Sequence, residues 1–404
     1  MSERSVARTG RVISIDADEL SVSAETVTRH KIGDSGACLG DWVRVKDSHV
    51  QVLSTGHRTP DVSDDWSRMH ANHGERLWAM RERAIIIDTI RQSLRGRGLL
   101  EVETPAMAAS PGVELHLDAV AVDVREGMGG AMRKRWLVTS PEFHMKRLLS
   151  AGSGPIFQIA KVFRSGERGV WHNPEFTMLE WYRTDATYHH LIEDFMVMME
   201  RCDETLRSFR AQHGRAEPPA KLKPLQVIGF AEALDKWADV QVAQPSLQAL
   251  AEHCRSRGFD VRDRDDEATI LTQVLVQGVE PNLPRNRPVV IDRWPKSLAS
   301  LARRRDDDPE LADRFEIYAA GTELANGFTE LTDPIEQRQR FEYDLQQRAQ
   351  LKRPQYPIDE RFLAALEVGC PPCAGVAVGI DRVIMALGGY SDIDQVLSFP
   401  FERA

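Results

Sequence analysis

The sequence has little cysteine and no long apolar run. Its 404 residues include five scattered cysteines, an odd number that suits a reducing compartment better than a disulfide framework. No stretch of about 18 apolar residues is present, and residues 1–10 contain no apolar signal core. We therefore expect a cytoplasmic protein with no membrane anchor.

Positive charge is also scarce. The chain carries 52 Lys and Arg against 61 Asp and Glu, which gives a net charge of −9. A protein that grips a long nucleic acid usually presents a basic face. The charge balance therefore argues against a large RNA footprint, and against tRNA as a partner.

The first 56 residues have the pattern of a small β domain. Short alternating runs between residues 10 and 53 are separated by turn formers, which predicts strands that close into a small barrel. Seven Lys and Arg against eight Asp and Glu give residues 1–56 a net charge of −1. Because a barrel that reads RNA is usually basic, we expect this one to pack on a protein surface.

The rest of the chain divides into a linker and one large domain. Residues 57–74 are polar, with little apolar periodicity, and are expected to form the linker. A helical pattern then runs from Leu77 to Leu94, and a strand ending at Pro105 is expected to follow it. Within the large domain, residues 75–404, we expect residues 205–290 to be a variable helical insertion.

The densest chemical signal lies in two predicted strands, residues 157–164 and 176–182. Period two places Arg164 on one face of the first strand, and Phe176, Glu180 and Tyr182 together on one face of the second. This combination suits a ligand floor, because an aromatic ring can stack a base, a guanidinium can hold a phosphate and a carboxylate can hold an ammonium. The alternative is an exposed strand face with an ordinary salt bridge.

A second cluster is acidic. Glu316, Glu323 and Glu330 fall within fifteen residues, and Asn326 and Phe328 share a strand face with Glu330. Converging carboxylates repel one another unless cations lie between them, so Mg²⁺ and a substrate ammonium are the candidates. The alternative, a solvated acidic strand, fits less well because apolar residues are interleaved.

A third segment, residues 374–382, has almost no side chains on one face. Gly375, Ala377 and Gly379 share that face, which lets a ligand or another backbone approach closely. Arg382 follows at the start of a predicted helix, whose N-terminal dipole favours phosphate. A small-residue strand entering such a helix predicts a phosphate-binding element.

These segments resemble a known family. Pro105, the stretch around Arg164 and residues 172–176, and residues 379–382 resemble motifs 1, 2 and 3 of the class II aminoacyl-tRNA synthetases. Residues 140–148, 176–180 and 323–331 resemble the lysyl branch, and within it the family of ligases that attach a lysyl or β-lysyl group to a lysine of elongation factor P. The resemblance covers about residues 75–404. It implies an α+β fold, an antiparallel sheet flanked by helices, beside the small N-terminal β domain.

On the nucleotide side, the resemblance implies ATP bound between two catalytic arginines. Arg164 would hold the substrate carboxylate and then the α-phosphate, and Arg382 would grip the γ-phosphate side. Phe176 would stack the adenine, and His172 would lie near the outer phosphates. Lysyl enzymes commonly read Arg-Asn-Glu in motif 2, whereas the glutamate that would contact adenine here, Glu167, stands one position later.

The same resemblance implies a magnesium site and an amino-acid pocket. Glu316 and Glu323 would hold Mg²⁺. Glu142 would take the amino group nearest the carboxylate, while Glu330 with Tyr182 would take the distal ammonium. The implied pocket residues are Glu142, Glu180, Tyr182, Asn326, Phe328, Glu330, Ala377 and Gly379.

The expected activity is ATP-dependent conversion of lysine or β-lysine to the aminoacyl-adenylate, followed by transfer to a lysine of elongation factor P, with Mg²⁺ as cofactor. A homodimer through the Pro105 segment is expected. One alternative is a stand-alone synthetase that charges tRNA or another carrier, which a basic N-terminal barrel would favour. Another is a non-catalytic regulatory module, which loss of the arginines or of the metal carboxylates would favour.

Overall fold

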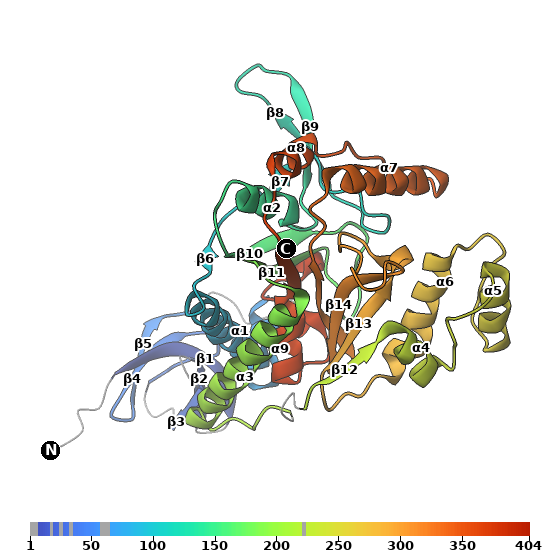
Figure 1. Cartoon of the computed structure of the whole chain (residues 1–404). Coiled ribbons are helices and arrows are strands. Elements are labelled where there is room, and N and C mark those ends of the chain that lie inside the picture. Colours follow the sequence, from blue (N-terminus) through green and yellow to red (C-terminus); the bar gives the residue numbers. More distant parts are fainter. Residues whose placement is uncertain (1–6, 17–18, 24–26, 32–34, 57–64, 220–223) are drawn as a thin grey trace.

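The computed structural model describes residues 7–16, 19–23, 27–31, 35–56, 65–219 and 224–404, and Figure 1 shows the whole chain. The N-terminal part forms a five-stranded antiparallel sheet in the order β3-β2-β1-β4-β5. Its strands are β1 (Arg8–Asp16), β2 (Glu19–Ser23), β3 (Val27–Lys31), β4 (Trp42–Lys46) and β5 (His49–Ser54). The sheet has an apolar cluster of its own, which includes Val12, Leu20 and Val43. The predicted small β domain is present.

Helix α1 (Asp65–Arg95) begins inside the predicted linker. Residues 57–64 of that linker lie outside the described part of the chain, and residues 65–74 form the first turns of the helix, so this part of the proposed linker is helical. Polar composition does not prevent a helix, and Asp65 places an acidic group in its first turn. The helix ends at Arg95, before Gly96 and Gly98, as predicted. We retain residues 1–56 and 75–404 as the proposed domains.

The large domain is built on an eight-stranded sheet in the order β12-β13-β14-β15-β16-β11-β10-β6. Neighbouring strands are antiparallel except in the pairs β12–β13 and β10–β6, so the predicted α+β class is confirmed. The strands are β6 (Leu100–Glu101), β10 (Ile156–Phe163), β11 (Glu175–Thr184), β12 (Gln226–Gly229), β13 (Val289–Pro295), β14 (Leu311–Ala319), β15 (Thr322–Thr329) and β16 (Cys373–Gly379). The strand expected to end at Pro105 is shorter, since only β6 belongs to the sheet.

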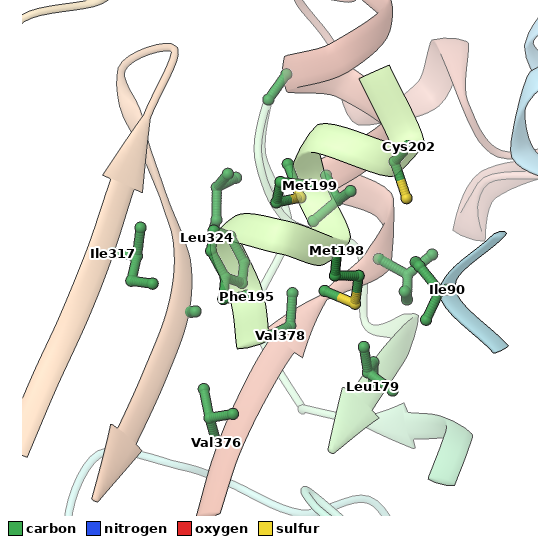
Figure 2. Close-up of a cluster of buried hydrophobic side chains, with 14 of the residues drawn as sticks. Ile90, Leu179, Phe195, Met198, Met199, Cys202, Ile317, Leu324, Val376 and Val378 are labelled. Atoms are coloured by element: carbon green, nitrogen blue, oxygen red, sulfur yellow. The ribbon is translucent and has the colours of Figure 1, made fainter. Parts of the chain in front are cut away.

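Helices cover one face of this sheet. They are α1, α3 (Tyr188–Gln212) and α9 (Ile380–Gly388). In Figure 2, Phe195 and Met198 of α3 lie against Val376 and Val378 of β16, and all four are buried. Since side chains alternate along a strand, residues 375, 377 and 379 of β16 point to the opposite face. The helical layer therefore leaves that opposite face for a ligand.

Smaller elements surround the opposite face. A three-stranded sheet in the order β7-β9-β8 precedes helix α2 (Glu142–Ser150). Its strands are β7 (Met107–Ala108), β8 (Ala121–Arg125) and β9 (Met132–Leu137), and the β8–β9 hairpin projects from the domain in Figure 1. Helices α7 (Pro334–Gln350) and α8 (Glu360–Val368) pack beside α2. Together these elements form a wall along the open face.

The insertion at residues 205–290 is mainly helical, as expected, but it also contributes a strand. Its first residues complete α3, and β12 extends the edge of the main sheet by pairing with β13. Its helices are α4 (Phe230–Ala238), α5 (Leu247–Ser256) and α6 (Glu267–Val274), followed by a π turn (Leu275–Val279) and a 3₁₀ turn (Glu280–Asn282). Short 3₁₀ turns also occur at Lys296–Leu298, Ile393–Gln395 and Phe401–Arg403. Among the residues described, none of the helices has the length and apolar character needed to cross a membrane.

Candidate active site

Five neighbouring strands place one row of side chains across the open face of the sheet. Gln158 of β10 pairs with Glu180 of β11, and Glu180 pairs with Ala377 of β16. Ala377 pairs in turn with Asn326 of β15, and Asn326 with Glu316 of β14. Directly paired residues point to the same face. The row therefore joins the three segments that the sequence singled out, with Ala377 at its centre.

A cavity of about 890 Å³ lies over this row. Thirteen of the residues expected at the site line it: Glu142, Arg164, Glu167, His172, Phe176, Glu180, Glu316, Glu323, Asn326, Phe328, Ala377, Gly379 and Arg382. The other two, Tyr182 and Glu330, are buried beneath the lining. Three buried polar atoms of lining residues, Asn326 Oδ1, Arg164 Nε and Arg314 Nε, have no hydrogen-bond partner among the described residues. Such atoms are expected where a polar ligand supplies the partner.

The nucleotide end of the cavity contains both arginines. The Arg164 guanidinium lies 5.1 Å from the centre of the Phe176 ring, and its Nη1 lies 3.9 Å from a Glu167 carboxylate oxygen. Arg382 lies at the start of α9, where Nη1 donates to the Glu323 carbonyl oxygen at 2.9 Å and Nη2 lies 2.7 Å from His172 Nε2. Burial lowers the pKa of His172, and the charge of Arg382 adds to the shift. A neutral ring beside Arg382 leaves that guanidinium as the cation available to an anionic ligand.

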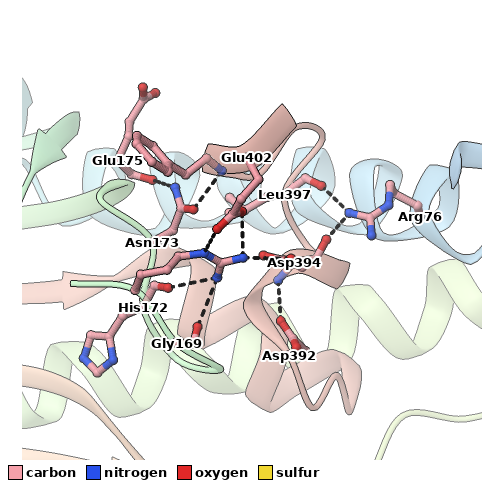
Figure 3. Close-up of polar contacts among 11 residues, drawn as sticks. Arg76, Gly169, His172, Asn173, Glu175, Asp392, Asp394, Leu397 and Glu402 are labelled. Carbon is pink, nitrogen blue, oxygen red and sulfur yellow. Dashed lines mark hydrogen bonds and ion pairs between the residues drawn. The ribbon is translucent and has the colours of Figure 1, made fainter. Parts of the chain in front are cut away.

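The loop between β10 and β11 is fixed to the C-terminal segment (Figure 3). Arg168 donates to both Glu402 carboxylate oxygens at 2.7 and 2.9 Å and to Asp394 at 3.1 Å. Asn173 accepts from the Phe401 N–H and donates to the Glu175 carbonyl oxygen. These bonds hold the loop that carries Arg164 and His172 in one conformation.

Two of the acidic residues lie side by side near Arg382. Glu316 accepts from Arg314 at 2.6 Å and from the Tyr318 hydroxyl, while Glu323 lies 3.5 Å from Arg382. Burial raises the pKa of Glu316, although the Arg314 guanidinium opposes that shift. Within the described ranges, no group of three or more metal-binding side chains comes together. A pair of carboxylates nevertheless suits Mg²⁺, which usually takes one or two from the protein and the rest from phosphates and water.

The amino-acid end is organised by a buried lysine that the sequence analysis did not assign. Lys146 of α2 is almost fully buried, and its Nζ lies 2.6 Å from Glu142 and 2.5 Å from Glu330. Burial lowers the pKa of Lys146, but the two carboxylates outweigh this and raise that pKa well above its usual range. Burial raises the pKa of Glu330, and the charge of Lys146 opposes the shift. The sequence signal was available, since Lys146 stands four residues after Glu142 on one helix face.

Glu180 lies next to this ion-pair cluster. The Ser140 hydroxyl donates to one oxygen of Glu180 at 2.5 Å, and the Tyr182 hydroxyl donates to the other at 3.1 Å. Burial raises the pKa of Glu180 to about 8, and the charge of Glu142 adds to the shift. The pocket therefore holds more carboxylates than cations, which suits a positively charged ligand.

Gly375 explains how Tyr182 and Glu330 come together. A β-carbon at this position would lie 2.1 Å from the Tyr182 ring and 2.5 Å from Glu330 Oε1, so only glycine fits. The Tyr182 and Glu330 side chains thus both pack over Gly375. These are the two residues expected to share the distal ammonium. Neither reaches the cavity lining, where Glu142 and Glu180 are exposed to the ligand space instead.

The architecture is that of a class II synthetase, and the comparison with protein families agrees. The profile of the tRNA synthetases class II (D, K and N) matches residues 67–403. The chain belongs to this family, as its three motifs predicted, and is an ATP-dependent ligase.

Its curated relatives place it more narrowly. The elongation factor P–(R)-β-lysine ligase of Haemophilus influenzae is 42% identical over 323 residues, which are 80% of this chain and 95% of that protein. The ligase of the same name from Histophilus somni is 40% identical over 322 residues, 80% of this chain and 94% of that protein. The one from Proteus mirabilis is 40% identical over 328 residues, 80% and 95% of the two chains. The expected similarity to ligases of elongation factor P is therefore confirmed.

Proposed function

We propose that this protein uses ATP to convert lysine or β-lysine to the aminoacyl-adenylate and then transfers the aminoacyl group to a lysine side chain of elongation factor P. The observation that carries the proposal is one continuous cavity with two arginines at one end and a carboxylate-rich pocket at the other. The names of the relatives supply the acceptor. The same arginines and carboxylates argue against a non-catalytic module.

In the activation step, Arg164 would neutralise the carboxylate of the amino acid and the α-phosphate that it attacks. Phe176 would stack the adenine, with Glu167 at its edge, while Arg382 and His172 would lie beside the outer phosphates. Attack on phosphorus depends mainly on positioning and charge neutralisation. No general base is needed here, because a carboxylate is already a nucleophile.

Glu316 and Glu323 would hold Mg²⁺. They are adjacent carboxylates at the phosphate end of the cavity, and Mg²⁺ usually takes one or two carboxylates from the protein. When bound, the metal would neutralise the charge of the ATP phosphates. The protein residues orient the nucleotide around it.

The pocket would recognise a substrate with two ammonium groups. Glu142 would hold the amino group nearest the carboxylate, and Glu330 with Tyr182 would attract the distal ammonium. Glu180 offers a further carboxyl group, which a bound ammonium would help to ionise, and the unpaired Asn326 Oδ1 offers another acceptor. Phe328, Ala377 and Gly379 would contact the carbon chain.

The remaining alternative is a synthetase that charges tRNA. The net charge of −9 and the small, slightly acidic N-terminal segment argue against it. The cytoplasmic location expected from the sequence stays a prediction.

An acceptor assay tests the proposal. Purified enzyme, ATP, Mg²⁺ and labelled β-lysine or lysine are incubated with elongation factor P or with bulk tRNA at physiological salt. Label should enter elongation factor P and not tRNA, and replacement of the acceptor lysine by arginine should abolish labelling. Efficient charging of tRNA, with elongation factor P unlabelled, would show that the acceptor is wrong.

A further inference from the structure

The outer part of the cavity contains an acidic side chain that the activation step does not use. Glu114 lies in the loop before β8, is half-buried, and lines the cavity together with Glu142 and Arg164. No described residue makes a hydrogen bond or ion pair with its carboxylate. Each of the residues expected at the site has a proposed role in binding ATP, Mg²⁺ or the amino acid. Glu114 has no role in that scheme.

The loop that carries Glu114 is held rigidly. Arg348 of α7 is completely buried, and its Nη1 donates to the carbonyl oxygens of Glu114, Leu115 and Leu117 at 2.7, 3.2 and 2.9 Å. Its Nη2 also donates to Asp118 at 2.7 Å. A surface loop rarely receives so many bonds from one buried cation. The hydrogen bonds of Arg348 therefore fix the backbone that positions the Glu114 carboxylate.

The surroundings of Glu114 favour proton uptake at neutral pH. Burial raises the pKa of Glu114 to about 7. The charges of Glu142 and Asp344 add to the shift, whereas those of Arg164 and Lys146 oppose it. A carboxyl group with a pKa in this range accepts a proton more readily than an ordinary glutamate, and a substantial fraction of it is still ionised near neutrality. It lies close to Arg164, which would hold the acyl phosphate.

The transfer step needs such a group. A lysine side chain arrives mostly as an ammonium, because its ordinary pKa is about 10.4, and an ammonium cannot attack a carbonyl carbon. His172, at the nucleotide end of the cavity, already contacts Arg382, whose Nη2 lies 2.7 Å from His172 Nε2. Glu142 is already paired with Lys146. The Glu114 carboxylate, by contrast, lines the cavity beside Arg164 and has no hydrogen-bond or ion-pair partner among the described residues.

We propose that Glu114 is the catalytic base of the transfer step, the group that takes the proton from the acceptor amine. The inference rests on the proposed function. Glu114 accepts one proton from the ammonium, and the nitrogen electron pair forms the bond to the carbonyl carbon of the adenylate. The bond from that carbon to the phosphate oxygen then breaks, and the second nitrogen proton leaves with AMP. An amide, AMP and a protonated Glu114 result, so atoms and charge balance.

The test separates transfer from activation in the full-length enzyme. Glu114→Gln is compared with Glu267→Gln, which removes an exposed carboxylate at the mouth of the same cavity. Activation is followed by pyrophosphate exchange. The adenylate is then trapped either with hydroxylamine, a neutral amine at pH 7, or with elongation factor P and the small amine Nα-acetyl-lysine amide.

A catalytic base contributes about 10²–10⁴-fold, so Glu114→Gln should slow transfer to both lysine amines at least ~100-fold relative to its own exchange rate. In Glu114→Gln, trapping by hydroxylamine should fall no more than exchange does. In Glu267→Gln, transfer should not fall relative to exchange. In wild type, transfer should rise with pH as Glu114 ionises, and this inflection should disappear in Glu114→Gln. Glu114→Asp should retain the inflection with a lower rate, which guards against a folding defect in the first variant.

Two results would overturn the inference. If exchange, hydroxylamine trapping and transfer all fall together, Glu114 binds the amino group of the substrate. If exchange and transfer to both lysine amines stay close to wild type, Glu114 is not the base. Failure of the wild type to label elongation factor P would instead reject the proposed acceptor, and the small amine would still test Glu114.

Discussion

At the scale of single residues, the pocket is defined by an imbalance of buried charge. Glu142, Glu180 and Glu330 surround one cation, Lys146. Buried ions are costly unless they are paired, and one lysine cannot satisfy three carboxylates. A substrate with two ammonium groups would restore the balance, so each carboxylate is expected to affect binding of the substrate.

Glu330→Gln is the sharpest test of this balance. The change removes a partner both of Lys146 and of the expected distal ammonium, and breaking a buried pair costs about 3–5 kcal/mol. At ~1.4 kcal/mol per decade, pyrophosphate exchange with lysine should fall by about two to three orders of magnitude. The exposed Glu367→Gln on α8 is the control. Exchange within tenfold of wild type would show that Glu330 does not serve the substrate.

Ala377 is the residue expected to select between lysine isomers. It sits between Glu180 and Asn326 in the row across the open face of the sheet. In β-lysine the amino group is one carbon farther from the carboxylate, so a methyl group could press on α-lysine and fill space beside β-lysine. A change of this size is worth about 1–3 kcal/mol, or ~10–200-fold.

The prediction is that Ala377→Gly shifts the ratio of the two activation rates toward α-lysine. Ala374→Gly removes a methyl group from the opposite, core-facing side of β16 and should leave the ratio unchanged. An unchanged ratio in Ala377→Gly would mean that the methyl group only tightens packing.

At the scale of elements, the wall of the cavity depends on the contact between α7 and the loop at residues 114–118. Arg348 is the centre of that contact, and its carbonyl partners lie far away in the chain. Sequence patterns describe α7 and the loop separately. The hydrogen bonds of Arg348 join the two segments into one side of the cavity.

Arg348→Met should therefore destabilise the large domain. The substitution leaves three partly buried carbonyl groups without their donor and Asp118 with Arg353 as its remaining partner, and loss of a hydrogen bond to a charged group costs about 1.5–3 kcal/mol. The midpoint of urea denaturation should fall clearly. Arg338→Met, on the exposed side of the same helix, removes only a surface pair with Glu360 and should leave the midpoint close to wild type. Equal midpoints for both variants would show that the anchor carries little energy.

At the scale of the whole molecule, the segment around Pro105 leaves apolar surface uncovered. Leu100 of β6 is 57% exposed and Met107 of β7 is 41% exposed. Exposed apolar residues that cluster at a sheet edge often mark an interface between subunits. We propose that a second copy of the chain covers this segment.

Light scattering on the purified enzyme should then give twice the chain mass of 45.6 kDa. The double change Leu100→Asp with Met107→Asp should yield monomers, because two charges cannot be buried across such an interface without partners. Val368→Asp, on an exposed residue of α8, should remain dimeric. A monomeric wild type, or a dimeric double variant, would reject the Pro105 segment as the interface.

The sequence by itself determined the fold class, the three motifs and the faces of the strands that carry them. Period-two alternation is a local property, so the grouping of Gly375, Ala377 and Gly379, or of Phe176 and Glu180, follows from backbone geometry alone. The end of α1 before Gly96 was readable for the same reason. Its start at Asp65 was not, because a polar segment becomes helical through contacts that composition does not reveal.

Only the tertiary structure decided which of these faces meet. The register that sets Glu180, Ala377, Asn326 and Glu316 in one row joins strands distant in the chain, and local periodicity does not specify it. Lys146 could be placed on the face of Glu142 by helical spacing, but its contact with Glu330 depends on how α2 packs against the residue that follows β15. Glu114 gave no sequence signal, since its position comes from the bonds of Arg348 to a loop without regular structure. Local geometry thus set the chemistry of each segment, and long-range packing decided which segments share one cavity.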